Sequence, residues 1–184
     1  MTYKCLKSST YQSEDFRLEP IQSNNIESIR IWRNSQMDVL RQNKIITTNS
    51  QVDYFNHKVW PEMDRSNPDN ILFSFFHQNT LVGYGGLVHI SWQDLRSEIS
   101  FLLNPIYLKE DIYKIYFSKY LTLIKMVAFE DLEFNRLFTE TYNIRDLHIS
   151  ILESNGFVKE GVLREHLIIN GMKIDSIFHG ILNK

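Results

Sequence analysis

The chain has 184 residues, enough for one domain with a substantial core, and 43% of them are hydrophobic while 23% are charged. The net charge of −2 excludes the general basic surface that binds nucleic acids or acidic membranes. A single cysteine, Cys5, excludes an internal disulfide and favours a reducing compartment. We therefore expect one domain over residues 1–184, cytoplasmic, with no nucleic-acid or membrane partner.

The chain begins with weak strand signals and a first helix. Residues 1–15 are polar and predict an edge strand or a loose arm, whereas Phe16 to Leu18 alternates as a strand does. Ser23 or Asn24 is expected to cap a helix that runs to Trp32.

Two more helices are expected before the sheet resumes. A short one is predicted over residues 37–42. The run from Thr48 to Gln51 has the form of a capping box, with Gln51 at the N3 position, and predicts a helix that Pro61 and the polar run from Asp64 to Asn70 end.

The middle of the chain predicts three successive strands. Residues 71–76 and 81–90 are apolar runs joined by a turn at Gln78-Asn79, and glycines in the second run predict a bulge or a close backbone approach. Arg96 to Leu103 alternates at first and then becomes wholly apolar, as a central strand covered on both faces does. Asn104-Pro105 ends that strand because proline supplies no donor to a sheet.

The last third predicts a long helix, a strand, a helix and a hairpin. Apolar residues recur at helical spacing up to Leu132 and cover most of the circumference, so this helix must lie against the sheet. Residues 135–142 alternate, a helix follows over 146–153, and Asn170-Gly171 predicts a type I′ turn. The order predicts an α/β (α+β) fold: a mixed sheet of six to seven strands with helices on both faces. The strand at 96–103 should lead through a right-handed crossover into a parallel strand at 135–142.

This order, with the closing run from Leu152 to Glu165, resembles the GNAT superfamily of N-acetyltransferases over almost the whole chain. The most similar branch holds the ribosomal-protein N-terminal acetyltransferases and the bacterial amino-sugar acetyltransferases. Gly156-Phe157 followed by Glu160-Gly161 resembles the penultimate strand of that branch. Trp32-Arg33-Asn34 is similar to the start of the amino-sugar enzymes.

The resemblance implies a GNAT-like acyl-CoA N-acyltransferase fold and acetyl-CoA as the acetyl donor. It implies that the two parallel strands lie side by side and diverge at their carboxyl ends to open a cleft. Backbone amides near Leu102 and Leu103 would then hold the thioester carbonyl.

One departure from the family concerns the pyrophosphate of the cofactor. Members usually carry a glycine-rich loop before the long helix, and the corresponding residues here contain no glycine. Glu110 and Asp111 would lie near the helix N-terminus, where they compete with a phosphate. Lys109 and Lys114 are therefore the candidate cofactor-binding residues.

Three residues are candidates for acid–base chemistry. Glu98, on an apolar strand, is a candidate base, although a salt bridge with Arg96 accounts for it equally well. The family's usual acid is a tyrosine on the following helix, at a position that is Leu152 here. Tyr142 and His148 are the substitutes, against the alternatives of a packed aromatic ring and a structural histidine.

Four residues are candidates for binding the acceptor. Arg33 and Asn34 follow the first helix, in a region that walls the acceptor site of related folds, and arginine suits a phosphate. A surface helix terminus explains them equally well. Thr139 and Glu140 lie on a strand that flanks the groove in the family, although threonine favours strands in any case. No residue spacing indicates a metal site.

The leading hypothesis is an acetyl-CoA-dependent N-acetyltransferase of a small amine, with the amino group of a nucleotide-linked sugar as the acceptor. The alternatives are a protein N-terminal acetyltransferase of the ribosomal-protein type and a non-catalytic GNAT-fold binding protein. The expected partner is a small-molecule amine, and a homodimer is the candidate assembly.

Overall fold

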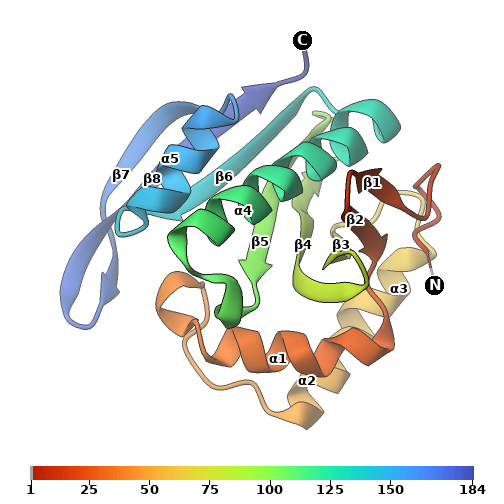
Figure 1. Ribbon diagram of the computed structural model, residues 1–184, viewed down its shortest axis with the longest axis horizontal. Coiled ribbons are helices and arrows are strands. Elements are labelled where there is room, and N and C mark those ends of the chain that lie inside the picture. Colours follow the sequence, from red (N-terminus) through yellow and green to blue (C-terminus); the bar gives the residue numbers. More distant parts are fainter. Residues whose placement is uncertain (1) are drawn as a thin grey trace.

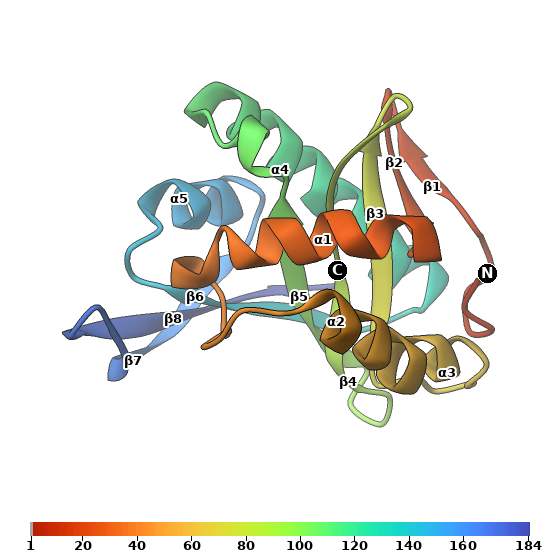
Figure 2. The ribbon, with the colours of Figure 1, turned by 90° about the horizontal axis from the view of Figure 1, so that it is seen from below.

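The computed structural model describes residues 2–184, which form one eight-stranded sheet with helices on both sides (Figures 1 and 2). The strands are β1 (Tyr11–Ser13), β2 (Phe16–Pro20), β3 (Ile71–His77), β4 (Thr80–Ser91), β5 (Arg96–Leu103), β6 (Arg136–Tyr142), β7 (Val158–Ile169) and β8 (Met172–Leu182). The helices are α1 (Ile26–Asn34), α2 (Thr48–Tyr54), α3 (Trp60–Met63), α4 (Glu110–Lys125) and α5 (Asp146–Ser154). Short 3-10 turns occupy Ser23–Asn25, Met37–Val39 and Pro105–Tyr107, and π-helical turns follow α2 at Phe55–Val59 and α4 at Met126–Asp131. Within residues 2–184, no helix has the length and apolar character needed to cross a membrane.

The strands follow the order β1-β2-β3-β4-β5-β6-β8-β7, in which β5 and β6 are parallel and the other described neighbours are antiparallel. The predicted fold class is confirmed, with one strand more than expected because β1 pairs with β2 at the edge. The closing hairpin is also confirmed, since Asn170 and Gly171 have φ angles of 50° and 79°, as a type I′ turn requires. Helices α4 and α5 cover one side of the sheet, and α2 and α3 lie on the other (Figure 2).

The sheet splits between its two parallel strands, as expected from the family. Pairing runs from Arg96 opposite Arg136 to Glu98 opposite Phe138 and goes no further. Beyond that point β5 stays paired with β4 up to Leu103, and β6 stays paired with β8 up to Tyr142. Each strand therefore keeps its outer partner while the two inner edges separate, which opens a gap inside the sheet rather than at its rim.

Aromatic packing fixes α4 against β5. The ring of Phe101 stacks on Phe117 of α4 with centroids 4.7 Å apart, and the Tyr120 hydroxyl donates a hydrogen bond of 2.6 Å to the Ser100 carbonyl. Gly85 on β4 makes this approach feasible, because a Cβ there would lie 2.5 Å from the Tyr120 oxygen. The long helix is thus held directly beside the strand that borders the split.

Three sequence predictions about helix ends were wrong. The cap of α2 is Thr47, whose side chain accepts from the Ser50 amide at 3.1 Å, while the Gln51 side chain instead donates to the Ile26 carbonyl. The capping box is therefore shifted by one residue from the predicted position. Pro61 does not end the helical segment, since proline is tolerated in the first turn of α3. The segment ends at Met63, directly before the polar run that was also expected to end it. No side-chain cap precedes α1, which begins instead through a 3-10 turn.

Candidate active site

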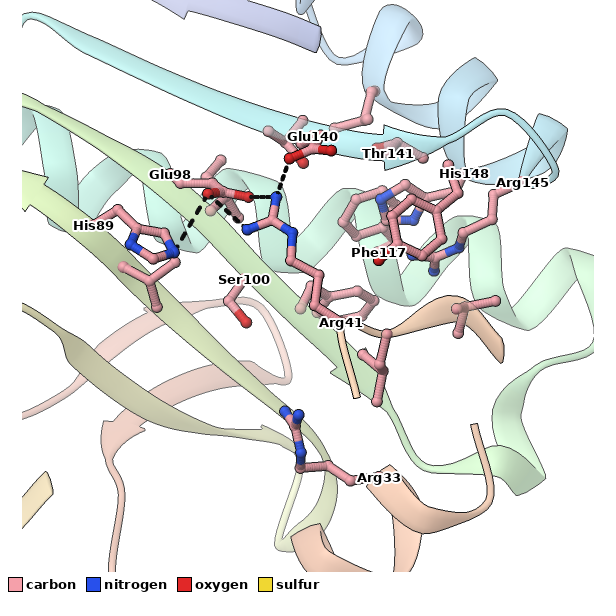
Figure 3. Close-up of a pocket in the computed structure, with 18 of the residues that line it drawn as sticks. Arg33, Arg41, His89, Glu98, Ser100, Phe117, Glu140, Thr141, Arg145 and His148 are labelled. Atoms are coloured by element: carbon pink, nitrogen blue, oxygen red, sulfur yellow. Dashed lines mark hydrogen bonds and ion pairs between the residues drawn. The ribbon is translucent and has the colours of Figure 1, made fainter. Parts of the chain in front are cut away.

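A cavity of about 360 Å³ opens where β5 and β6 separate (Figure 3). We call it the cleft cavity; its walls include Arg41, Glu98, Phe101, Glu140, Tyr142 and His148. The walls come from β4, β5, β6, all helices except α3, and the segment before α2. The cavity therefore lies at the split that the sequence predicted as the site.

Alternation along the two strands gives the cleft cavity two different sides. Phe101 on β5 faces α4, so its neighbour Ser100 faces the opposite side of the sheet, toward α1 and α2. Thr139 on β6 lies opposite His179, which contacts Glu153 of α5. Glu98 and Glu140 therefore share the side toward α1 and α2, and Thr139 and Thr141 share the side toward α4 and α5.

One arginine joins the two acidic residues across the split (Figure 3). The Nη2 atom of Arg41 donates to Glu98 Oε1 at 2.8 Å and to Glu140 Oε2 at 2.5 Å, and Nη1 donates to Glu98 Oε2 at 3.3 Å. The expected salt bridge of Glu98 with Arg96 is not formed. Arg96 lies near Asp94 instead, with Nε and Oδ2 3.4 Å apart. Burial lowers the pKa of Arg41, but the two carboxylates raise it by more, so the net shift of this pKa is upward.

Two histidines and a serine surround this acidic pair. His89 Nε2 lies 3.8 Å from Glu98 Oε2, and His166 Nε2 lies 3.6 Å from Glu140 Oε1. The Ser176 hydroxyl donates to Glu140 Oε1 at 2.5 Å and fixes that carboxylate. His89 has a φ of 51° in the irregular stretch where the β4–β5 register shifts, and this backbone turns its side chain into the cleft cavity.

Tyr142 lies on the same side of β6 as Glu140 and lines the cleft cavity. Burial raises the pKa of its hydroxyl, the charge of Arg41 lowers it, and Glu140 and Glu98 raise it further. The net shift is upward, so the phenol keeps its proton at neutral pH. That protonation state is the one a proton donor needs.

His148 is buried on the side toward α4 and α5. Its ring stacks on Phe117 with centroids 4.1 Å apart, and its Nδ1 accepts from the Tyr113 hydroxyl at 2.8 Å. Tyr113 in turn accepts from Arg145 Nη2 at 2.9 Å, which leaves the tyrosine proton for the histidine. Burial first, and then the charge of Arg145, lower the pKa of His148 well below its ordinary value. The imidazole is therefore neutral at pH 7, which disfavours an imidazolium acid.

The backbone of β5 offers donors at the split. The Asn104 amide donates to the Val82 carbonyl at 2.8 Å, and the antiparallel register is regular from there to Glu98. Because pairing alternates along such a ladder, the amide of Leu102 faces β4, whereas those of Phe101 and Leu103 face the gap. Of the two expected residues, Leu103 is thus the one whose amide faces the gap, although neither side chain lines the cleft cavity.

The start of α4 provides a second group of donors. Its first intrahelical bond runs from the Tyr113 amide to the Lys109 carbonyl, and Lys109 makes no side-chain cap, so the three preceding amides have no intrahelical acceptor. Lys109 and Lys114 are exposed and have no ion-pair partner within residues 2–184. A cavity of about 200 Å³, here the inner cavity, lies between this helix start and α5 and shares Arg145 and His148 with the cleft cavity. These features fit a thioester cofactor with a phosphate end, despite the missing glycines.

A third cavity, of about 420 Å³, adjoins the cleft cavity on the α1 and α2 side. We call it the side cavity; its walls include Ile29, Arg33, Lys44, Tyr54, Phe55 and Tyr84. Arg33 Nη1 donates to the Tyr84 hydroxyl at 2.6 Å, and Nε donates to Gln42 Oε1 at 3.1 Å. Among the described residues, no carboxylate pairs with Arg33.

The four expected acceptor residues are therefore dispersed. Arg33 and Glu140 face the side with α1 and α2, and Thr139 faces α4 and α5. Asn34 lines neither cavity, because its side chain accepts from the Ile46 amide at 2.9 Å and donates to the Ile46 carbonyl at 2.8 Å. It holds the segment before α2 in place. No group of three or more metal-binding side chains gathers within residues 2–184.

Sequence reasoning missed three residues that the structure places at the site. Arg41 falls within the short helix expected over residues 37–42, but the structure forms only a 3-10 turn at Met37–Val39 and leaves Arg41 outside it. Arg145 lies in the turn between β6 and α5, so no sequence signal pointed to either arginine as a site residue. His89 falls within the apolar run 81–90, which predicts a strand and gives no sign of a site residue. The glycines of β4 did predict an irregular strand, but the register shift that places His89 follows Val88.

The chain was also compared with known proteins. The family described as acetyltransferase (GNAT) domain matches residues 18–178, and no curated protein matches. The fold is similar to spermidine N-acetyltransferase from Vibrio cholerae in complex with CoA and spermine, with a TM-score of 0.79, 17% identity, and coverage of 93% of this chain and 97% of that chain. A dodecameric structure of spermidine N-acetyltransferase from Vibrio cholerae in an intermediate state gives a TM-score of 0.74 at 16% identity, with coverage of 93% and 95%.

At sequence identities this low, the structural similarity supports the fold but not the identity of the acceptor. It does not assign the chain to the amino-sugar branch or to the ribosomal-protein branch. The family match is of a different kind, because it spans most of the chain and includes every element around the cleft cavity. Acetyl-CoA is the acetyl donor of this family, in agreement with the free backbone amides at the split and at the start of α4. The chain belongs to the acetyltransferase (GNAT) domain family and is an N-acetyltransferase.

Proposed function

We propose that this N-acetyltransferase acetylates a small acceptor that carries an anionic group besides its amine, and that this acceptor is a nucleotide-linked amino sugar. The observation that carries the proposal is Arg33. It lies where the side cavity adjoins the cleft cavity, and no described carboxylate neutralises it. An unpaired guanidinium in a largely apolar cavity suits a phosphate or carboxylate of the ligand.

Each side of the split has its own part in the reaction. Acetyl-CoA supplies an activated acetyl group, and the amides of Phe101 and Leu103 are placed to donate hydrogen bonds to its carbonyl oxygen. Glu98 takes a proton from the acceptor nitrogen, which keeps the electron pair that forms the new bond. Tyr142, protonated at neutral pH, would give its proton to the sulfur as the carbon–sulfur bond breaks, and the second proton lost by the acceptor nitrogen would restore the phenol.

The remaining proposed contacts follow from position. Lys109 and Lys114 would attract the cofactor phosphates to the start of α4, and Thr139 and His148 would line the path of the cofactor on the α5 side. Glu140 faces the acceptor side together with Glu98. Asn34 would act on the acceptor only through the segment that it holds.

The proposed acceptor differs in charge from spermidine and spermine, the polyamines named for the solved structures. A polyamine carries several positive charges and needs acidic walls. Here the walls of the three cavities hold two carboxylates, Glu98 and Glu140, and more cationic side chains than that: Arg33, Arg41, Lys44 and Arg145. This balance disfavours a polyamine.

A release assay for the CoA thiol tests the proposal. Wild-type protein is given acetyl-CoA with a nucleotide-linked amino sugar, with spermidine, or with a peptide bearing a free N-terminus. We expect the nucleotide-linked sugar to give the highest kcat/KM. We also expect Arg33→Gln to raise KM for it by about tenfold to a hundredfold, since a charged hydrogen-bonding partner is lost.

The matched control is Arg65→Gln. Arg65 is a half-exposed arginine paired with Glu62 and Asp69, away from the cleft and side cavities, and its loss should leave KM unchanged. A preference for spermidine or for the peptide would overturn the assignment of the acceptor. An unchanged KM in Arg33→Gln would remove Arg33 from the acceptor site.

We further propose that the protein acts in the cytoplasm as a homodimer. Strand β7 ends the sheet with its outer edge unpaired, and Val158 and Ile168 are exposed there by 66% and 71%. Such an edge is suited to pairing with a second chain. Light scattering in solution measures the mass, and a monomer at high concentration would contradict the proposal.

A further inference from the structure

Arg41 occupies the two carboxylates that an amine acceptor must reach. The Nη2 atom of Arg41 lies within hydrogen-bonding distance of both carboxylates, Glu98 on β5 and Glu140 on β6. Figure 3 shows the guanidinium between the two carboxylates, with its side chain entering from the segment before α2. A single nitrogen thus bridges the separated strands.

The two carboxylates form a fixed pair. Their side chains are each 11% exposed, and Ser176 donates to the second oxygen of Glu140. His89 lies near Glu98 and His166 near Glu140, so each carboxylate has a histidine on its outer side. Without a cation between them the negative charges would repel each other in a partly desolvated place. The geometry is therefore a binding site for a positively charged nitrogen.

Arg41 is bound less firmly than the groups that it joins. It lies between the 3-10 turn at Met37–Val39 and α2, outside any helix or strand, and its side chain is 48% exposed. Its side-chain hydrogen bonds within residues 2–184 go to these two carboxylates alone. An ion pair with one half-exposed partner contributes little net stability, because solvent screens it. A competing cation can therefore displace the guanidinium.

We propose that Glu98 and Glu140 form a site for a cationic nitrogen, which Arg41 fills in the free protein and from which the ammonium of the acceptor displaces it. An ammonium has three N–H donors and can bridge two carboxylates as Nη2 does. Once bound there, it lies against Glu98, which takes one proton as the N–H bond breaks and an O–H bond forms. This inference rests on the proposed acetyl transfer, but the site can be tested without it.

The first experiment measures binding of simple cations to the Arg41→Ala variant. Its melting temperature is recorded with methylammonium, methylguanidinium or tetramethylammonium chloride at equal ionic strength. We expect the first two to raise the melting temperature of the variant more than that of the wild type, because in the wild type they must first displace Arg41. Tetramethylammonium has no N–H donor and should have no effect.

Two further variants act as controls. Arg41→Ala with Glu140→Gln has one carboxylate fewer and should lose the response. Arg41→Lys keeps a cation in the site and should behave as the wild type does. Arg41→Gln also removes the cation while keeping more of the side chain, and it takes the place of Arg41→Ala if that variant fails to fold. An equal response of wild type and Arg41→Ala, or no response of Arg41→Ala, would overturn the inference.

The second experiment is kinetic and separates displacement from direct recognition. If Arg41 competes with the acceptor, Arg41→Ala should lower KM for the acceptor by roughly threefold to tenfold, since the competing internal cation is gone. If Arg41 instead binds an anionic group of the acceptor, KM rises, and the inference is wrong. Should the wild type acetylate none of the acceptors tested, the proposed function fails while the melting experiment still decides the cation site.

Discussion

Replacing Glu98 by glutamine removes the proposed base while keeping the shape of the side chain. Glu98 is 8% exposed, on β5, where the last ladder pair with β6 is formed. The amide has one oxygen that can still accept from Arg41, and Arg41 keeps its 2.5 Å bond to Glu140. The substitution therefore removes a charge and a proton acceptor from the cleft cavity with little change in packing.

The structure separates the expected effects on rate and on stability. One general base contributes roughly 100- to 10,000-fold to a rate, so kcat should fall within that range. The lost ion pair has a half-exposed partner, so it should contribute about 1 kcal/mol or less to the free energy of unfolding. For a chain of this length that corresponds to a decrease of about 2–4 °C in melting temperature.

The assay compares kcat from thiol release with the melting temperature of the same preparation. Glu160→Gln is the matched control, because Glu160 pairs with Arg136 on the outer part of the sheet and lines none of the three cavities. It should lower the melting temperature by a similar amount and leave kcat unchanged. A kcat of Glu98→Gln within about threefold of the wild type would mean that Glu98 only holds Arg41, and the assignment of the base would be wrong.

Three further predictions concern the cofactor end, acid stability and the unpaired hydroxyl. Replacing Glu110 and Asp111 together by glutamine and asparagine should tighten CoA binding measured by calorimetry, because two like charges leave the start of α4; unchanged affinity would show that they point away from the phosphates. The pKa of His148 is lowered in the folded protein, so below about pH 6.5 the unfolded chain binds its proton first and stability falls as pH falls. His148→Gln should therefore lose less stability than the wild type between pH 7 and pH 5 in urea unfolding, and parallel losses would contradict this. The Thr141 hydroxyl is buried without a partner within residues 2–184, so Thr141→Val should raise the free energy of unfolding by about 1 kcal/mol, whereas a decrease would reveal a bond to water or ligand.

The framework of the fold could be predicted because it depends on repeated patterns. The alternation of Leu137, Thr139 and Thr141 describes a strand with one buried face, and the structure buries those three residues. The parallel pairing of β5 with β6 followed from the long apolar helix between them. Patterns of this kind involve many residues, so an error at one position does not change the result.

Details set by single side chains could not be predicted in the same way. Gln51 made Thr48 the better cap in the sequence, but in the structure the Ser50 side chain accepts from the Thr47 amide at 2.9 Å and makes Thr47 the cap of α2. Arg41 reaches the cleft cavity from a segment with no regular structure. Its partners are 57 and 99 residues away along the chain, so no local pattern records the contact.

The acceptor of this enzyme must be inferred from side chains, because the fold is shared by enzymes with other acceptors. A TM-score of 0.79 at 17% identity to a spermidine N-acetyltransferase fixes the arrangement of strands and helices around the split. It does not determine the charge of the cavity walls. Here the cleft cavity is lined by three arginines, Arg33, Arg41 and Arg145, and by the two carboxylates of Glu98 and Glu140. A ligand with only positive charges would meet more repulsion than attraction there, whereas one with an amine and a phosphate finds a partner for each. The charge of these walls therefore supports the proposed acceptor, an amine that carries its own anion.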